Sequence, residues 1–227
     1  MLKLGLSLVT QQASIALSLD GRSIAERKLR IKTLDNIIDV VDQLLVEAHV
    51  TLQDVDELVV VNGPGGYAGV RMSVTIAKMW GLTLEMPIKA INSVELLAYQ
   101  VRYFEGLIVV AMRSRKDEVN FGLFGGVGLA LNPIIPFEPI NLQKLSEKLS
   151  HIDGDFLIVG DLLEEEVPDL NKFVFQEPDA MSAINLSESK ETIDFEHLNP
   201  IYAYPVNINT DKKKPKSRSN RSKKTSS

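Results

Sequence analysis

The hydrophobic and polar positions at the start of the chain follow the period of β-strands. Residues 2–8 form a short apolar run, and residues 13–19 alternate serine or alanine with isoleucine and leucine. Asp20-Gly21 is a strong signal for a tight hairpin turn, and residues 23–31 return as a third strand. This pattern predicts three consecutive antiparallel strands.

The pattern changes to the helical period over residues 35–48 and again over residues 69–82. In the first segment, apolar residues keep helical spacing, and Asp35 is placed to cap the helix. In the second segment, apolar side chains surround the helix except for a narrow polar strip. Such a helix needs cover on two sides. A sheet provides one, and a neighbouring helix, a second domain or another protein must provide the other.

Two further strands and a third helix complete this half of the chain. The apolar runs 58–61 and 88–91 predict buried strands, and residues 92–104 open with a capping sequence and continue as a helix. The resulting order, βββαβαβα, is that of an actin/Hsp70-like subdomain and differs from the strict alternation of a Rossmann fold. We therefore expect an α/β protein with an actin/Hsp70-like fold.

The second half of the chain has shorter and less regular elements. Apolar strands at 107–112 and 119–124 flank a charged turn, and a proline-rich extended segment follows. A helix at 141–149 and a strand at 156–159 come next. These elements predict a smaller, degraded α/β subdomain.

Charge is distributed unevenly along the chain. The net charge is −5, but residues 212–227 hold eight lysines and arginines and no acidic residue. Subtracting these eight from the 25 basic residues leaves 17 against 30 acidic residues, so the body has a net charge of −13. The basic segment has no apolar residue except proline and is too polar to order itself. We expect an N-terminal subdomain (1–105), a smaller C-terminal subdomain (106–206) and a disordered basic tail (207–227).

Composition excludes several kinds of chemistry. The chain has no cysteine, which excludes disulfides, thiolate zinc sites and a cysteine nucleophile. No apolar run reaches the roughly 18 residues of a membrane span, and the N-terminus lacks the cleavage site of a signal peptide. His49, His151 and His197 lie far apart, and none has a histidine partner four residues on, so no metal site is expected.

The most specific stretch joins the strand at 58–61 to the second helix. Glycine at this place permits positive φ angles and close approach of another backbone or a ligand, and exposed amides at a helix start attract anions. Arg71, in the first turn, opposes the helix dipole, so we expect it to meet a carboxylate or a phosphate. The loop residues are Gly63, Pro64, Gly65, Gly66 and Gly69.

The residues alone leave three interpretations of this loop. A P-loop requires Lys and Ser/Thr after its last glycine, where this chain has Val70-Arg71. The glycine spacing fits a loose dinucleotide fingerprint, although Glu85 precedes the next strand instead of ending it. The third interpretation is a tight turn that packs the helix on the sheet. A stand-alone ATP- or NAD-dependent enzyme using the loop Gly63–Gly69 is therefore the alternative function.

The string GPGGYAGVR, with the following VTIAKMWGL and PIKAINSVELLA, resembles the GPGSFTGLR…VSSLEALA core of the TsaB (YeaZ) family. The similarity runs without a gap over about forty residues, and the C-terminal HLNPIYAYP is similar to the closing segment of the family. The resemblance implies the actin/Hsp70-like (ASKHA, ribonuclease H-like) two-subdomain fold. It also implies a role beside TsaD in making threonylcarbamoyladenosine on tRNA.

The resemblance further implies how the chain pairs. TsaB-like proteins pair through these two helices, with themselves or with TsaD. We therefore expect a non-catalytic scaffold for a TsaD-like catalytic subunit, which transfers the threonylcarbamoyl group to tRNA adenosine 37. Methionine and tryptophan are typical of such interfaces. The expected interface residues are Ile37, Val40, Val41, Leu44, Met72, Thr75, Ile76, Met79 and Trp80.

Other partners follow from the same resemblance. They are a TsaE-like ATPase, a second copy of the chain when the TsaD-like subunit is absent, and tRNA, contacted indirectly or through the basic tail. A cytoplasmic location without membrane contact is expected. The tail has no aromatic residue to stack on a base, which disfavours specific recognition of RNA by the tail itself.

Two departures from the family pattern weigh against a nucleotide site in this chain. Leu6-Ser7-Leu8-Val9 stands where TsaB-like proteins read IDTS, so Ser7 replaces an acidic residue. Arg113-Ser114-Arg115 stands where they read DAR. No cofactor of its own is expected. ATP or ADP and a metal would belong to the partner subunit or to the joint with it.

Overall fold

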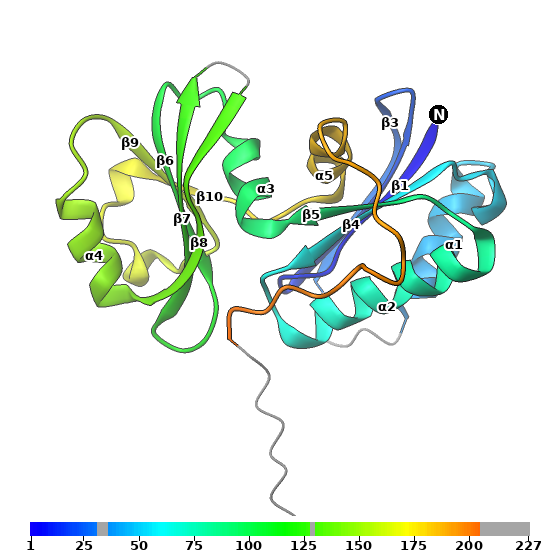
Figure 1. Cartoon of the computed structure of the whole chain (residues 1–227), viewed down its shortest axis with the longest axis horizontal. Coiled ribbons are helices and arrows are strands. Elements are labelled where there is room, and N and C mark those ends of the chain that lie inside the picture. The colour runs from blue at the N-terminus through cyan, green and yellow to red at the C-terminus, as the bar shows by residue number, and fades with distance from the viewer. Residues whose placement is uncertain (31–35, 128–129, 205–227) are drawn as a thin grey trace, which may run out of the picture.

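A computed structural model describes residues 1–30, 36–127 and 130–204, which form two five-stranded sheets with helices on their faces (Figure 1). The first sheet has the order β3-β2-β1-β4-β5, with β1, β2 and β3 antiparallel and β4 and β5 parallel to β1. The predicted βββαβαβα order of this half is confirmed. Its strands are β1 (Leu2–Ser7), β2 (Gln12–Leu19), β3 (Arg22–Arg30), β4 (Glu57–Gly63) and β5 (Ile88–Asn92).

Side-chain alternation and one turn account for the β1–β2–β3 meander. Asp20 and Gly21 have φ angles of +49° and +79°, as the tight hairpin turn requires. On one face of β2, Ile15 lies in the main hydrophobic core. On the other face, the Ser14 hydroxyl accepts a hydrogen bond from the backbone N–H of Ala180 at 2.9 Å. The period-two pattern therefore separates two environments on opposite faces of the sheet.

Helices α1 (Ile37–Glu47) and α2 (Tyr67–Leu84) cover one face of the first sheet (Figure 1). The helix predicted over residues 35–48 corresponds to α1, but its predicted cap, Asp35, lies outside the described residues. The predicted 69–82 helix begins two residues earlier and ends two residues later than expected. Both helices pack on alternate side chains of β1 and β4, which form the main core with them.

Helices α5 (Ala180–Ser187) and α3 (Ser93–Gln100) lie on the opposite face. α5 packs against β1, β2 and β4, whereas α3 lies between the two sheets and contacts strands of both (Figure 1). The Asn92 side chain caps α3 by accepting from the N–H groups of Val94 and Glu95 at 2.8 and 3.2 Å. The helix ends at Gln100, earlier than the predicted 104, because the chain turns there toward the second sheet.

The second sheet has the order β10-β9-β6-β7-β8. Its edge strand β8 carries Pro133, Pro136 and Pro139, in agreement with the predicted extended edge segment. Helix α4 (Leu142–Ser150) packs on β7 and β8. Two 3₁₀ turns, Glu164–Glu166 and Leu170–Lys172, precede the last strand. The strands are β6 (Gly106–Arg113), β7 (Glu118–Val127), β8 (Ala130–Asn141), β9 (Phe156–Gly160) and β10 (Phe173–Phe175).

A buried ionic cluster joins the first sheet to the end of α5, and sequence patterns gave no sign of it. The ammonium of Lys3 lies 2.9 Å from the Glu57 carboxylate and 2.6 Å from that of Glu188. Lys89 lies 3.4 Å from Glu57 and donates to the Ser187 carbonyl at 3.0 Å. Because two of these side chains are almost fully buried, removing either partner would leave an uncompensated charge inside the protein.

The chain returns to the first sheet after β10, which differs from the predicted division at residue 106. Residues 180–204, assigned by sequence to the second subdomain, pack on the first sheet and on α2, because α5 and the segment after it bury their apolar side chains there. The predicted basic tail, 207–227, lies outside the described residues. Within the part of the chain that the structure describes, no helix is long and apolar enough to cross a membrane.

Candidate functional site

The glycine loop between β4 and α2 packs backbone against backbone on the β1–β2 turn. A Cβ atom added to Gly65 or Gly69 would collide with the carbonyl oxygens of Val9 and Leu8. The N–H of Gly66 donates to the Val9 carbonyl at 2.7 Å. These glycines therefore allow a close approach of the chain to itself, and they set where α2 begins on the sheet.

The first glycine of the loop also needs its own conformation. Gly63 has a φ angle of +106°, which side chains other than glycine rarely adopt. A Cβ atom there would meet the carbonyl oxygen of Ile201, so the C-terminal segment passes directly over this residue. Ser93, at the start of α3, donates its hydroxyl hydrogen to the Pro64 carbonyl. The loop is thus held by contacts from three distant parts of the chain.

The structure corrects the expected interface on α1 and α2. Val40 and Met72 are half-buried, and only Thr75 and Met79 are exposed. The other five lie in the core of this chain because their helix faces point toward the sheet and toward each other, and no partner is needed to cover them. These five residues are Ile37, Val41, Leu44, Ile76 and Trp80.

The second side of α2 is covered by residues 193–204, which we term the C-terminal strap. Ile193 pairs with Ile88 at the edge of the first sheet, and Leu198 is fully buried in the main core. The strap runs along α2 in Figure 1. The chain itself thus supplies much of the cover that the apolar pattern of α2 requires, and it does so with residues that the sequence assigned to the second subdomain, one of the alternatives that the pattern left open.

Hydrogen bonds and one aromatic contact fix the strap. The Asn62 side chain donates to the Asn199 carbonyl at 3.0 Å, and the Ile201 N–H donates to the Asn62 carbonyl at 2.8 Å. Lys78 of α2 donates to the Glu196 carbonyl at 3.4 Å. At its end, the ring of Tyr202 stacks on that of Tyr67 with centroids 5.3 Å apart.

A strip along one edge of α2 stays exposed after the strap has docked. It consists of Arg71, Thr75, Met79 and Leu82, whose spacing of four, four and three residues places them in one row. The side chains of Met79 and Leu82 are 45% and 63% exposed. We call this row the α2 strip. Leu82 had the same helical spacing as the predicted interface residues and could have been included on that signal.

Arg71 lies at the start of the strip and contacts tyrosine. Its guanidinium donates to the hydroxyl of Tyr67 at 3.0 Å and lies 5.2 Å from the centre of that ring. Among the described residues, no carboxylate lies within ion-pairing distance of Arg71, so the carboxylate or phosphate that the sequence predicts for it stays a prediction for a ligand or a partner. The first turn of α2 also holds no acidic residue. The positive end of the helix therefore carries an exposed cation with no anionic partner among the described residues.

A cleft of about 980 Å³ separates the two halves of the molecule. The N-terminus of α2 and the β1–β2 turn line one side of it, and the β6–β7 turn and the residues after β9 line the other. The charges on its walls balance. The cations are Arg30, Arg113, Arg115 and Lys116, and the anions are Asp117, Asp161, Glu166 and Glu177.

Burial raises the pKa of two acidic residues of the cleft, Asp161 and Glu177. Burial raises the pKa of Asp161 to about 6, the N–H of Arg113 opposes the shift by donating at 2.6 Å, and the Glu177 carboxylate adds to it. Burial also raises the pKa of Glu177. Ser7, at the position of the missing acid, is fully buried and donates to the Pro178 carbonyl at 2.6 Å. Its hydroxyl is thus engaged within the chain.

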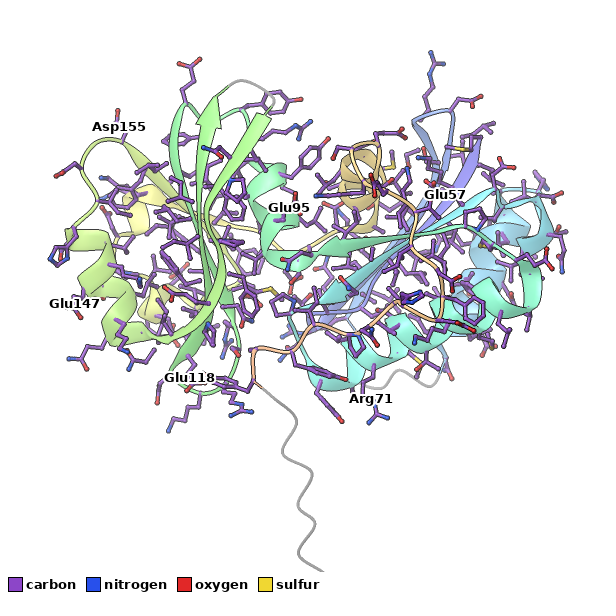
Figure 2. All side chains as sticks on the ribbon, in the orientation of Figure 1. Glu57, Arg71, Glu95, Glu118, Glu147 and Asp155 are labelled. Atoms are coloured by element: carbon purple, nitrogen blue, oxygen red, sulfur yellow. The ribbon has the colours of Figure 1, made fainter. Side chains whose placement is uncertain are left out.

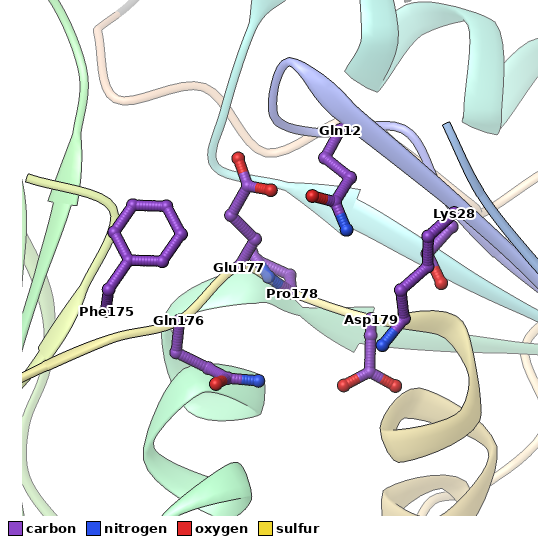
Figure 3. A pocket seen from close by; sticks show the side chains of 8 residues that line it. Gln12, Lys28, Phe175, Gln176, Glu177, Pro178 and Asp179 are labelled. Carbon is purple, nitrogen blue, oxygen red and sulfur yellow. The ribbon is translucent and has the colours of Figure 1, made fainter. Parts of the chain in front are cut away.

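A smaller pocket of about 150 Å³ lies beside the segment that crosses from β10 to α5 (Figure 3). Asp179, on its wall, caps α5 by accepting from the Ser182 N–H at 2.8 Å. Gln100 donates to the Glu177 carbonyl at 3.1 Å. These hydrogen bonds hold the segment that crosses from β10 to α5. Across residues 1–30, 36–127 and 130–204, no three His, Asp or Glu side chains gather in a way that could hold a metal.

The two-sheet architecture places the protein in the actin/Hsp70-like (ASKHA) class of α/β folds. A solved structure of YeaZ from Pseudomonas aeruginosa superposes with a TM-score of 0.74 at 22% identity, over 88% of this chain and 99% of that chain. At this identity the likeness establishes the fold, and the predicted fold class is confirmed.

Sequence similarity then identifies the family. The family model described as TsaD, tRNA N6-adenosine threonylcarbamoyltransferase, matches residues 29–148. The tRNA threonylcarbamoyladenosine biosynthesis protein TsaB of Bacillus subtilis is 34% identical over 148 residues, which cover 64% of this chain and 65% of that protein. The chain belongs to the TsaB (YeaZ) family, within the larger family that the TsaD model describes.

A second relative has the same name as the family model. The tRNA N6-adenosine threonylcarbamoyltransferase of Protochlamydia amoebophila is 39% identical to this chain over 66 residues, which cover 29% of this chain and 19% of that protein. The match with the Bacillus subtilis protein also spans slightly less than two thirds of that relative.

Proposed function

We propose that this protein acts in the synthesis of threonylcarbamoyladenosine on tRNA. In this proposal it is a non-catalytic subunit that supports a TsaD-like transferase acting at tRNA adenosine 37. The names of the relatives, tRNA threonylcarbamoyladenosine biosynthesis protein TsaB among them, support the pathway. A TsaE-like ATPase as an additional partner and a cytoplasmic location belong to the same proposal.

The observation that carries the proposal is the exposed α2 strip. Met79 and Leu82 expose apolar side chains on a helix whose other apolar residues pack largely on the sheet and the strap. On α1, which covers the same face of the sheet, Val46 is 71% exposed. Methionine and leucine at helical spacing on α2, flanked by threonine and arginine, suit docking against the apolar face of another helix.

Homology supports the choice of partner. The family model of the transferase covers residues 29–148, a range that contains α1 and α2. Two chains that share the same helix pair can dock through equivalent surfaces related by an approximate two-fold axis, as in an isologous dimer. The same geometry permits two copies of this chain to pair when no transferase is present, so the homodimer is the expected free state.

Two features support a non-catalytic role. The Ser7 hydroxyl, at the position where TsaB-like proteins carry an acidic residue, is buried and donates to the Pro178 carbonyl. The loop glycines Gly65 and Gly69 approach the backbone of their own chain, so their presence is explained without a bound nucleotide. Both features disfavour the alternative of a stand-alone ATP- or NAD-dependent enzyme.

The experiment that tests the proposal is a binding titration of the purified chain with the TsaD-like subunit of the same organism. Met79→Asp and Leu82→Asp would each place a charge in an apolar interface, and each is expected to weaken pairing at least about 100-fold, the equivalent of roughly 3 kcal/mol. Trp80 is unsuitable for this test because its side chain is buried in the core.

Ile134→Asp is the matched control. Ile134 is an exposed apolar residue on β8, at the outer edge of the second sheet, and its replacement should leave pairing unchanged. Wild-type affinity in both α2 variants would reject docking through the α2 strip. Failure of the wild-type chain to bind the TsaD-like subunit at all would reject the partner.

A further inference from the structure

The two sheets of the described chain have four edge strands, and three of these are protected against pairing with a further strand. At the edge of β5, Ile193 of the strap pairs with Ile88. Strand β8 carries Pro133, Pro136 and Pro139, which have no backbone N–H, and its pairing with β7 is irregular. Strand β10 is only three residues long. The fourth edge strand, β3, is different.

Strand β3 is long, exposed and free of proline. Six of its nine residues are exposed and the other three are half-buried. Side chains of the β2–β3 hairpin extend into solvent, away from the second sheet (Figure 2). A bulge leaves Ile24 without a partner on β2, but residues 25–30 pair with β2 residue for residue. In the part of the chain that the structure describes, no strand lies on the outer side of β3, so this run offers unpaired backbone groups. We call residues 25–30 the β3 edge.

Basic side chains dominate β3. The strand holds four cations and one carboxylate, in a body whose net charge is −13. Lys28 lies 3.3 Å from Glu26, and Arg27 pairs with Glu47 of α1. Exposed pairs of this kind add little to stability, so the carboxylates of a ligand can replace them. We propose that the β3 edge binds an extended acidic segment of another protein, which adds a sixth strand to the first sheet.

The two faces of the β3 edge define the pattern of this segment. Lys28 is paired with Ser14 and, like Arg30, lies on the α5 face of the sheet. Ala25 and Leu29 pack at the rim of the main core on the opposite face. Opposed side chains of neighbouring strands lie about 5 Å apart, close enough to interact. The segment therefore alternates, with aspartate or glutamate beside the cations and apolar residues beside Ala25 and Leu29.

The same charges exclude a second copy of β3 as the added strand. Two β3 edges paired with each other would bring the cations of both strands together, with a single carboxylate on each strand to offset them. Like charges opposed on neighbouring strands are destabilising. Lysine and arginine thus protect this edge from its own kind, but they favour a strand of opposite charge.

The test titrates short labelled peptides with the full chain and follows fluorescence anisotropy. The probe is a six-residue peptide that alternates glutamate with valine, and its binding should saturate below about 1 mM. A peptide with three glutamates followed by three valines has the same composition and charge, and it should bind about 10-fold more weakly because it cannot match both faces. In hydrogen exchange, amides of the β3 edge should gain protection when the alternating peptide is bound.

Charge reversal on the strand should reverse the preference. Lys28→Glu and Arg30→Glu should each weaken binding of the glutamate peptide about 10-fold, and the double variant should bind a peptide that alternates lysine with valine. Lys144→Glu is the matched control, because Lys144 is exposed on α4 and its replacement changes the net charge equally. It should bind the glutamate peptide like the wild type. So should Met79→Asp, which separates this test from that of the proposed function.

Four results would each overturn the inference. Equal losses for Lys144→Glu and Lys28→Glu would mean that net charge alone attracts the peptide. Equal binding of the alternating and the rearranged peptide would mean that no strand is added. Binding that does not saturate by about 1 mM, or exchange protection outside β3, would place no acidic segment on this edge.

Discussion

The two halves of the molecule repeat one plan. In each half, a three-stranded antiparallel meander is followed by a helix, a parallel strand, a connection, a second parallel strand and a final helix. The sheet orders β3-β2-β1-β4-β5 and β8-β7-β6-β9-β10 correspond strand for strand. The two final helices, α3 and α5, contact each other between the sheets.

The halves differ most in the connection after the fourth strand of each. In the first half this connection is α2, a helix of 18 residues. In the second half it consists of two 3₁₀ turns of three residues each before the short strand β10. The second half closes its sheet without a long helix, so the topology alone does not demand α2. Its length, its glycine entry and its exposed strip are features that need their own explanation.

The test with the largest expected effect removes the side chain that anchors α2 in the core. Trp80 is 5% exposed and packs among residues of α1, β1 and the strap. Trp80→Ala should reduce the free energy of unfolding by about 3–5 kcal/mol, because the surrounding core relaxes only in part around the cavity. Urea denaturation measures this change.

Met79→Ala is the control for this substitution. Met79 is the preceding residue on the same helix, but it lies in the exposed α2 strip, so its loss should cost less than about 1 kcal/mol. Equal costs for the two variants would contradict the assignment of a buried face and an exposed strip. A small cost for Trp80→Ala alone would mean that the first half, like the second, does not need this helix for stability.

The sequence predicted the first half well because its signals are local. Strand alternation, the Asp20-Gly21 turn and the glycine string before α2 each occur within a few residues, and the structure has all three where they were expected. Element ends were less accurate: α3 ends before the predicted position 104, because turning into the second sheet depends on contacts made elsewhere.

The cover of α2 was not predictable in the same way. An apolar helix face indicates that something lies against it, but the pattern does not say whether this is the same chain or another. The strap is irregular in sequence and contacts residues far away along the chain, as the 137 residues between Asn62 and Asn199 illustrate. Five predicted interface residues therefore turned out to be core residues, whereas Thr75 and Met79 of the same prediction lie in the exposed α2 strip.

A second test concerns the entry to α2. Gly69→Ala would bring a Cβ atom into the Leu8 carbonyl, a backbone group that cannot move aside, and should cost about 2–3 kcal/mol by overpacking. Gly125→Ala in β7 of the second half is the control. The nearest atoms there are 4.0 Å from the added carbon, so the change should stay within about 0.5 kcal/mol. Thermal unfolding of both variants separates a steric requirement from a general intolerance of alanine.

The smallest expected effect on stability concerns Asp161, which follows β9 at the place where the glycine loop follows β4 in the first half. β4 leads into Gly63-Pro64, whereas β9 leads from Gly160 into Asp161, whose carboxyl has its pKa raised to about 6 by burial. Because the folded-state pKa lies above the unfolded value, the folded protein binds more protons between the two. This contribution to stability is present at low pH and is lost as the pH rises through about 6. Asp161→Asn keeps an oxygen for the Arg113 N–H but removes the charge.

Relative to the wild type, Asp161→Asn should therefore be more stable at pH 8 and nearly equal at pH 4. The full difference in pKa corresponds to about 3 kcal/mol, and partial exposure of the side chain reduces the expected gain to about 1–2 kcal/mol. Denaturation of both proteins across this pH range gives the difference curve. A stability difference that does not change with pH would mean that the Asp161 carboxylate is well solvated in the cleft. The end of β9 would then hold no carboxyl group whose ionisation opposes folding.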